Sequence, residues 1–163
     1  MLKDVCYMSR KVRVVVGGTF DIIHLGHLKF LWAAKKVAEN TELIVIVARD
    51  STVRKLKGRD PVFNEKERLE IVQNLKPVDK AILGRELDKD SFYDILQELK
   101  PDIVVLGYDQ KFSEKDIKKW AEQQGLSLKI IRLPKFSFNG LESSSEVRKK
   151  ILKIFTKTKG CQT

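Results

Sequence analysis

The sequence predicts an α/β protein, a single domain built on a doubly wound parallel sheet of five strands. Five short apolar runs rich in β-branched residues alternate with segments of helical periodicity along the 163 residues. Because these runs are mostly continuous rather than alternating in polarity, they are typical of strands buried on both faces. Repeated strand–helix alternation indicates parallel strands joined by crossover helices. We expect the domain to span 11–155, with tails at 1–10 and 156–163.

The five apolar runs give the expected strands. They are Val12–Val16, Leu43–Val47, Ala81–Leu83 with Val78 leading in, Ile103–Leu106 and Leu128–Leu133. In open parallel sheets, ligands bind beyond the carboxyl ends of the strands, near the point where the strand order reverses. The loops after the first, second, fourth and fifth strands are therefore expected to carry a binding site.

Five helices are expected between and after these strands, each with apolar residues three or four positions apart. Two have start signals, because Asn64 with Glu67 forms a capping box and Ser113 can cap the fourth helix. Two have stop signals, since Pro101 closes the third helix and Gly125 ends the fourth. The apolar faces are Leu28, Leu31, Ala34 and Ala38; Leu69, Val72 and Leu75; Phe92, Ile95, Leu96 and Leu99; Ile117, Trp120 and Ala121; and, from about Ser143, Val147, Ile151, Ile154 and Phe155.

The bulk properties narrow the class of protein. The net charge of +10 suits polyanionic partners, which include nucleotides, phosphorylated metabolites and nucleic acid. No apolar run approaches the roughly 18 residues that span a bilayer, and the N-terminus lacks a signal-peptide core, so we expect a cytoplasmic protein without a membrane partner. Cys6 and Cys161 have no metal-ligand spacing and are interpreted as free thiols, with a disulfide between them as the alternative.

The strongest functional pattern directly follows the first strand, where Gly17-Gly18-Thr19-Phe20-Asp21 leads through two residues to His24-Leu25-Gly26-His27. Paired glycines allow close approach of a ligand and positive φ angles. The start of a helix offers free N–H groups to phosphate. His24 and His27, the only two histidines, lie on one side of that helix with Gly26 between them. Two imidazoles there can donate hydrogen bonds to a triphosphate and stabilise charge during its transfer.

Other sites with glycines or histidines fit this pattern less well. A zinc site needs a third protein ligand, which no HExxH pattern or cysteine cluster supplies. The P-loop pattern GxxxxGK[ST] and the dinucleotide pattern GxGxxG are both absent. A purely structural role for both histidines remains the other alternative.

The run G-G-T-F-D-x-x-H-x-G-H resembles the signature of the cytidylyltransferase-like superfamily. This superfamily includes glycerol-3-phosphate cytidylyltransferase, phosphopantetheine adenylyltransferase and the archaeal-type FAD synthase. The resemblance extends from about Lys11 to Ile154. It includes a basic loop around Lys55–Arg59 and the stretch Glu142–Arg148, which looks like the second signature of the family, a serine-rich turn that opens a helix and is followed by arginine.

The resemblance implies roles for individual residues. The implied catalytic residues are His24, His27, Lys57 and Arg148. The implied nucleotide-binding residues are Gly17, Gly18, Thr19, Phe20, Asp21, His24, Gly26, His27, Gly107, Asp109, Ser143, Ser144, Ser145 and Arg148. The implied acceptor-binding residues are Asp21, Lys55, Arg68 and Phe136. Magnesium is expected to bridge triphosphate oxygens and to be held mainly by them, with no metal ligands from the protein.

Several of these residues also have a plain structural interpretation. The lysines around Lys57 suit a solvated loop, Arg68 can be an ion-pair partner, and Asp109 can belong to a simple turn. Ser143 with Glu146 can form a capping box, which is compatible with phosphate binding. Phe112, Phe136 and Phe138 can flank a flavin or lie in the core.

The expected reaction is attack by an acceptor phosphate on the α-phosphorus of a nucleoside triphosphate, with release of pyrophosphate. A phosphate monoester has a second pKa of about 6 and needs no general base, so positioning and charge neutralisation suffice. The stretches Glu42–Gly84 and Leu106–Gln110 look most like archaeal-type FAD synthase, which favours ATP over CTP and FMN as acceptor.

Three alternatives stay open. The second signature of glycerol-3-phosphate enzymes carries an Arg-Thr pair that Asn139–Ser145 lacks, which disfavours CTP and glycerol 3-phosphate. Phosphopantetheine is another possible acceptor. A basic nucleic-acid-binding module is the alternative outside the enzyme class, which the net charge favours and the lack of an aromatic–basic stripe disfavours. Members of the superfamily are often dimers, so a homodimer is a further expectation.

Overall fold

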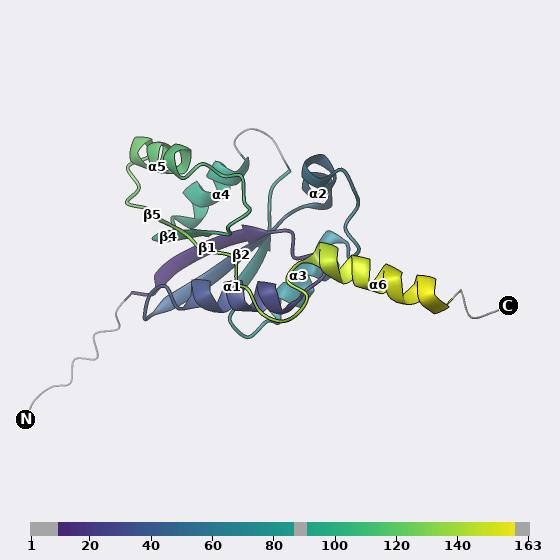
Figure 1. The fold of residues 1–163 in the computed structure, drawn as a ribbon. Coiled ribbons are helices and arrows are strands. Elements are labelled where there is room, and N and C mark those ends of the chain that lie inside the picture. Colours follow the sequence, from purple (N-terminus) through teal and green to yellow (C-terminus); the bar gives the residue numbers. More distant parts are fainter. Residues whose placement is uncertain (1–9, 87–90, 159–163) are drawn as a thin grey trace, which may run out of the picture.

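A parallel five-stranded sheet forms the middle layer of the computed structural model, which describes residues 10–86 and 91–158 (Figure 1). The strands are β1 Val12–Gly18, β2 Thr41–Val47, β3 Lys80–Leu83, β4 Ile103–Leu106 and β5 Lys129–Arg132. The helices are α1 Leu25–Lys35, α2 Asp50–Lys57, α3 Glu65–Gln73, α4 Ser91–Leu99, α5 Glu114–Gln123 and α6 Ser144–Thr158. The predicted fold class is confirmed.

The strand order is β3-β2-β1-β4-β5, which places β1 at the centre of the sheet. The chain moves outward from β1 to β3 and then crosses back to β4 on the other side of β1. β1 pairs in parallel with both of its neighbours. Its residues Val12–Gly18 pair with β2, and its residues Val14–Val16 pair with β4. Because the order reverses between β1 and β4, their carboxyl ends form the switch point at which ligands bind in such sheets.

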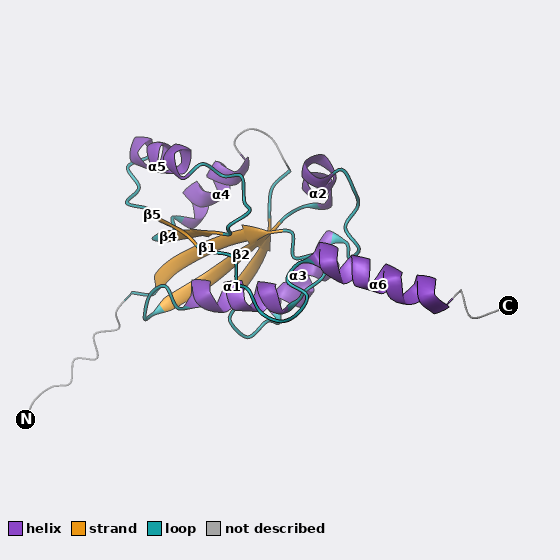
Figure 2. Ribbon diagram, viewed as in Figure 1, coloured by secondary structure: helices purple, strands orange, loops and turns teal. Residues whose placement is uncertain are grey.

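Helices cover both faces of the sheet, α1 and α3 on one and α4 and α5 on the other (Figure 2). Side chains of a strand alternate between faces, so β1 contributes Val14 and Val16 to one core and Val15 to the other. The helices contribute Leu31, Ala34 and Val72 to the first core, and Ile95, Leu96 and Ile117 to the second. Two buried faces explain why the strands read as continuous apolar runs.

The start signals of two helices are confirmed. Asn64 accepts hydrogen bonds from the backbone N–H groups of Lys66 and Glu67, and the Glu67 carboxylate accepts in return from the Asn64 N–H. Ser113 accepts from the N–H of Asp116 at the start of α5. Local sequence signals were sufficient here because each bond joins residues at most three positions apart.

The segment expected to be a basic loop is a helix instead. Asp50–Lys57 forms α2, which buries Thr52 and Val53 and ends at Gly58 with a φ of 64°. A positive φ at the end of a helix is favourable for glycine, which has no Cβ to clash. The segment is only eight residues long, and Thr52 and Val53 are its buried residues, so its few apolar positions did not indicate a helix. Lys55 and Lys57 therefore lie on a helix, and only Arg59 lies in the following loop.

The last helix extends beyond the sheet layers (Figure 1). It reaches Thr158, past the expected domain boundary at Phe155. Its expected apolar stripe is largely exposed, with Ile151 43% and Phe155 65% accessible. Its first turns contact the rest of the protein near the switch point, through Ser144 and Arg148. Cys6 and Cys161 lie outside the described residues. Among the described helices, none combines the length and apolar character needed to cross a membrane.

Candidate active site

Three segments converge on the loop between β1 and α1, at the carboxyl edge of the sheet. The loop after β4 reaches it through the Gln110 side-chain amide, which donates to the Gly17 carbonyl at 2.7 Å. The start of α6 reaches it through the Ser144 hydroxyl, which donates to the Ile22 carbonyl at 3.3 Å. The loop between α2 and α3 is joined to it through Asp21. The structure thus brings together the two signatures, which are more than a hundred residues apart.

The backbone of this loop is strained at Phe20, not at the paired glycines. Phe20 has a φ of 50° and a buried ring, whereas Gly17 and Gly18 continue β1 with no positive φ. The role of Gly18 is steric, because a Cβ there would lie 2.7 Å from Cε2 of the Phe20 ring. The expectation of positive φ at the glycines is therefore corrected, and the strain falls on the next aromatic residue, as often occurs at functional sites.

His24 is the N-cap of α1. Its Nδ1 accepts a hydrogen bond from the Gly26 N–H at 3.1 Å. The neutral ring therefore carries its proton on Nε2, where it can act as a donor. Burial lowers the pKa of His24 and thereby favours this neutral form, although the charge of Glu146 opposes the shift. The rings of His24 and His27 lie against each other in a tilted arrangement, with centroids 3.9 Å apart and an interplanar angle of 32°, so the two expected histidines are adjacent in the site.

His27 is the more strongly perturbed of the two. Burial lowers its pKa to about 3, with smaller contributions from His24 and Lys57. Asp21 and, more weakly, the Ile22 carbonyl oppose this shift. Nδ1 of His27 is buried with no hydrogen-bond partner in the described part of the chain. The Phe20 ring lies 5.3 Å away, centroid to centroid. His27 is therefore a neutral imidazole with unused hydrogen-bonding capacity.

This shift gives the stability of the protein a defined pH dependence. In the unfolded chain His27 has its ordinary pKa of 6.5, against about 3 when folded. Between these values the unfolded state binds more protons, so the free energy of unfolding falls on acidification below pH 6.5 and does not respond to this group above it. Urea unfolding at pH 7 and pH 5 should show a larger loss for wild type than for His27→Gln. Equal losses would contradict the assignment.

Asp21 connects three segments of the site. Its side chain is only 2% exposed, and Oδ1 accepts from the N–H groups of Val62 and Phe63 at 2.7 and 3.1 Å. Oδ2 lies 3.4 Å from a guanidinium nitrogen of both Arg59 and Arg148. A buried carboxylate with these partners orients the two arginines. A direct contact of Asp21 with nucleotide or acceptor stays a prediction.

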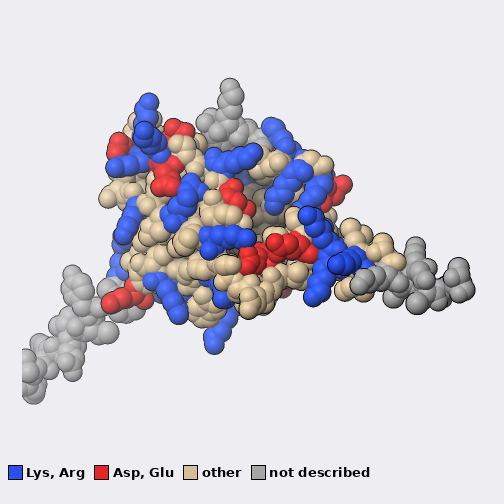
Figure 3. Space-filling view, viewed as in Figure 1, with Lys and Arg blue, Asp and Glu red and all other residues tan. Residues whose placement is uncertain are grey.

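The cations near Asp21 form a cluster, which we call the cationic cluster: Lys57, Arg59 and Arg148. Lys57 is exposed over much of its length, but partial burial of its ammonium group lowers its pKa, as do Arg59 and, more weakly, Arg148. Asp109 and Asp21 oppose this shift. In Figure 3, Lys and Arg side chains extend from α2 down to α6. Such a gathering of charge suits a polyphosphate.

Arg59 is the member of this cluster that the sequence did not single out. It belonged to the basic run Lys55–Arg59, but its position just beyond a helix was not apparent. A residue with positive charge directly after Gly58 and within reach of buried Asp21 could have been found only from the fold.

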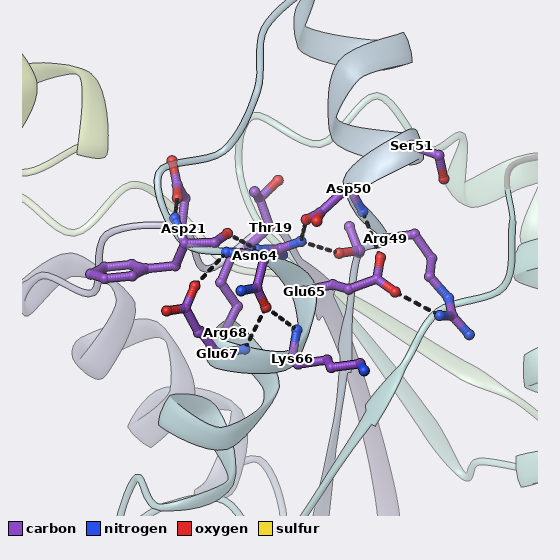
Figure 4. A network of polar contacts seen from close by, with 12 residues as sticks. Thr19, Asp21, Arg49, Asp50, Ser51, Asn64, Glu65, Lys66, Glu67 and Arg68 are labelled. Carbon is purple, nitrogen blue, oxygen red and sulfur yellow. Dashed lines mark hydrogen bonds and ion pairs between the residues drawn. The ribbon is translucent and has the colours of Figure 1, made fainter.

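Arg68 makes the structural contacts that were the alternative to a role in acceptor binding. Its side chain is fully buried. It donates to three carbonyls, those of Phe63, Thr19 and Ala48, at 3.0, 2.5 and 2.7 Å. Its remaining contact is an ion pair of 2.7 Å with Asp50 (Figure 4). With these contacts it joins the ends of β1 and β2 to α2 and α3. Burial therefore excludes Arg68 from contact with an acceptor in this conformation.

The serines at the start of α6 support its first turn. Ser143 accepts from the Glu146 N–H at 3.2 Å, and the Glu146 carboxylate accepts from the Glu142 N–H at 2.6 Å. Arg148 donates to the Ser145 hydroxyl at 3.2 Å. The Ser143 half of the expected capping box is therefore present, whereas the Glu146 carboxylate accepts from Glu142 and not from Ser143. Phosphate binding by these serines stays a prediction.

The other expected acceptor contacts lie on two different segments. Lys55 is exposed on α2, and Phe136 is half-buried in the loop after β5. Glu142 holds that loop, because it accepts from the Phe138 N–H and forms an ion pair of 2.7 Å with Lys135. These contacts lower the pKa of Glu142 to about 2. Two other aromatic residues were considered for a flavin. The ring of Phe138 lies under the ammonium group of Lys29, and the ring of Phe112 stacks on Phe92. No contact here identifies the acceptor.

Gly26 occupies a position where a side chain does not fit. A Cβ there would lie 3.0 Å from the Glu142 carbonyl oxygen and 3.0 Å from two atoms of the His24 ring. We expect Gly26→Ala to lower the free energy of unfolding by about 1–3 kcal/mol in urea titrations. Gly17→Ala is the matched control, because its Cβ would meet nothing closer than a carbonyl at 3.9 Å. Equal stability of the two variants would contradict the prediction.

The fold and the paired histidines at a helix start define the protein as a nucleotidyltransferase. The sequence model described as cytidylyltransferase-like matches residues 15–150. The chain belongs to the cytidylyltransferase-like family, which confirms the resemblance seen in its sequence.

Relatives and a solved structure agree with this family. An FAD synthase of Thermoplasma acidophilum is 51% identical, covering 88% of this chain and 96% of the relative. An FAD synthase of Korarchaeum cryptofilum is 46% identical, covering 88% and 93%. A crystal structure described as a lipopolysaccharide core biosynthesis protein of Thermoplasma volcanium is 45% identical with a TM-score of 0.70, covering 77% of this chain and 98% of the other.

Proposed function

We propose that this chain transfers the adenylyl group of ATP to FMN, which gives FAD and pyrophosphate. The observation that carries the proposal is the pair of adjacent neutral histidines at the start of α1, close to Lys57 of the cationic cluster. FAD synthases that are 42–51% identical over most of the chain supply the substrates. The alternatives with CTP, glycerol 3-phosphate or phosphopantetheine have no comparable support.

The residues of the site suit an in-line displacement. The FMN phosphate is already largely dianionic at neutral pH, so an oxygen of it can attack the α-phosphorus without a general base. The new O–P bond forms as the bond to the bridging oxygen of pyrophosphate breaks. His24 and His27 would donate hydrogen bonds to phosphate oxygens on which charge accumulates. The cationic cluster would stabilise the leaving pyrophosphate.

A divalent cation would take part through the triphosphate. Within 10–86 and 91–158, no three His, Cys, Asp or Glu side chains group together as a metal site. We expect the cation to be held mainly by phosphate oxygens, and magnesium is the expected ion. When bound, the cation supplies further neutralisation of the triphosphate charge. The histidines and the cationic cluster would position the phosphate groups around this cation.

The reaction can be tested directly. Purified protein is incubated with ATP, FMN and magnesium, and FAD and pyrophosphate are measured in the same samples by chromatography and a coupled assay. We expect equal amounts of both products and little product when CTP replaces ATP. Glycerol 3-phosphate and 4′-phosphopantetheine serve as competing acceptors. Turnover with one of these, but not with FMN, would overturn the proposed acceptor and keep the class of reaction.

The remaining expectations have simple tests of their own. Oligonucleotide binding that is strong, dependent on salt and unaccompanied by turnover would favour the nucleic-acid-binding alternative. Light scattering would establish whether the protein is a dimer, as family members often are. The cytoplasmic location stays a prediction from the sequence.

A further inference from the structure

One arginine at the end of β5 holds the loop that follows β4. Arg132 donates to the carbonyls of Gly107, Gln110 and Phe112 at 2.9, 3.0 and 2.8 Å. Its Nε also forms a 2.6 Å ion pair with Glu114, in the first turn of α5. A planar guanidinium can make all of these contacts at once, which an ammonium group cannot. The loop is therefore fixed from the side of β5 along its whole length.

A glutamine in the same loop fixes it from the other side. The Gln110 side-chain oxygen accepts from the Gly107 N–H at 2.8 Å, and its amide nitrogen donates to the Gly17 carbonyl at 2.7 Å. Gly17 belongs to β1 and precedes the loop with both histidines. Gln110 thus connects the loop after β4 to the loop that carries the candidate catalytic groups.

Between these two attachments lies Asp109. Its side chain is exposed, and its Oδ1 lies 3.5 Å from the position that a Cβ on Gly107 would occupy. The negative charge of Asp109 opposes the lowering of the pKa of Lys57, and the Gln110 bond to the Gly17 carbonyl holds this loop at the end of β1, next to the site. A carboxylate can accept hydrogen bonds from the hydroxyls of a ribose or the amine of a base. Asp109 can accept such hydrogen bonds only if the loop after β4 holds its side chain in one place.

We propose that Arg132 and Gln110 are positioning residues that hold Asp109 beside the cationic cluster, so that the nucleoside and the triphosphate of one ATP molecule bind together. This inference rests on the proposed function for the identity of the nucleotide. It assigns both residues to nucleotide affinity and leaves the chemistry to the histidines and the cationic cluster.

The test separates affinity from turnover. The variants are Arg132→Lys, which keeps the positive charge, Arg132→Ala, and Gln110→Glu, which keeps the shape but cannot donate to the Gly17 carbonyl. For each variant we expect the KM for ATP to rise about tenfold, equivalent to about 1.4 kcal/mol, with kcat and the KM for FMN within about twofold of wild type. Glu114→Ala is the matched control, because it removes the ion pair and leaves the carbonyl contacts of Arg132.

Calorimetric titration with ATP and magnesium, without FMN, gives a second readout that does not need turnover. The Kd should rise by the same factor as the KM in the three variants and stay near wild type in Glu114→Ala. Wild-type affinity in Arg132→Lys and Gln110→Glu would overturn the inference, as would a loss in Glu114→Ala equal to that in Arg132→Ala. Wild-type protein that binds ATP but forms no FAD would instead overturn the proposed function.

Discussion

His27→Ala lowers the rate of FAD formation by about 10²–10³-fold, the usual effect of removing one donor to a developing charge. His27 is neutral, its Nδ1 is buried with no hydrogen-bond partner among the described residues, and its ring faces His24 and Phe20. Because Nδ1 makes no hydrogen bond in the ligand-free protein, the substitution removes no hydrogen bond of this atom from the fold. The measurement is kcat at saturating ATP and FMN, with the midpoint of thermal unfolding as the control.

The pH profile provides a second check of this assignment. Because the pKa of His27 is lowered to about 3, its protonation cannot produce a step in activity near neutral pH. The profile of His27→Ala should therefore keep the shape of the wild-type profile at a lower level. Activity within tenfold of wild type, or a step near pH 6.5 that the variant loses, would remove His27 from the proposed role.

Arg68→Met lowers the free energy of unfolding by about 3–5 kcal/mol, because it breaks a buried ion pair and leaves three carbonyls without their donor. Arg68 is fully buried, and its contacts join the ends of β1 and β2 to two helices. Methionine fills much of the volume, so the loss comes from the polar contacts. Urea unfolding at pH 7 measures the change.

Arg54→Met is the matched control for this variant. Arg54 also pairs with an aspartate, Asp60, at 2.6 Å, but both side chains are more than half exposed. Exposed ion pairs contribute little to stability, so its unfolding curve should overlay that of wild type. Similar losses in both variants would show that the network around Arg68 is not responsible.

The parts of the fold that the sequence predicted depend on short-range patterns. β1 and β2 are apolar runs because both of their faces are covered, and the cap at Asn64 lies within three residues of its partners. The histidines were identifiable for the same reason, since a loop, a helix cap and two imidazoles lie within a few residues. Helix α2 was missed because Thr52 and Val53 alone form its buried side.

The contacts that organise the site could not be predicted in this way. Arg68 and the Thr19 carbonyl are 49 residues apart, and Arg148 and Asp21 are 127 apart. Nothing in the neighbourhood of Arg68 distinguishes a buried arginine from one that waits for a ligand. Such pairs are defined by the strand order, which places the ends of β1 and β2 side by side, and by the return of the chain to the site at α6.

The central position of β1 in the sheet also determines how this strand unfolds. The amides of Val14–Val16 lie in the buried middle of a strand that is paired on both edges, to β2 and to β4. Local fraying cannot expose such amides, so their exchange with solvent deuterium requires cooperative opening of the sheet. The histidine loop begins at the carboxyl end of this strand. The exchange of these amides should therefore follow the global free energy of unfolding, and it should slow when a ligand that binds at the end of β1 stabilises the folded protein.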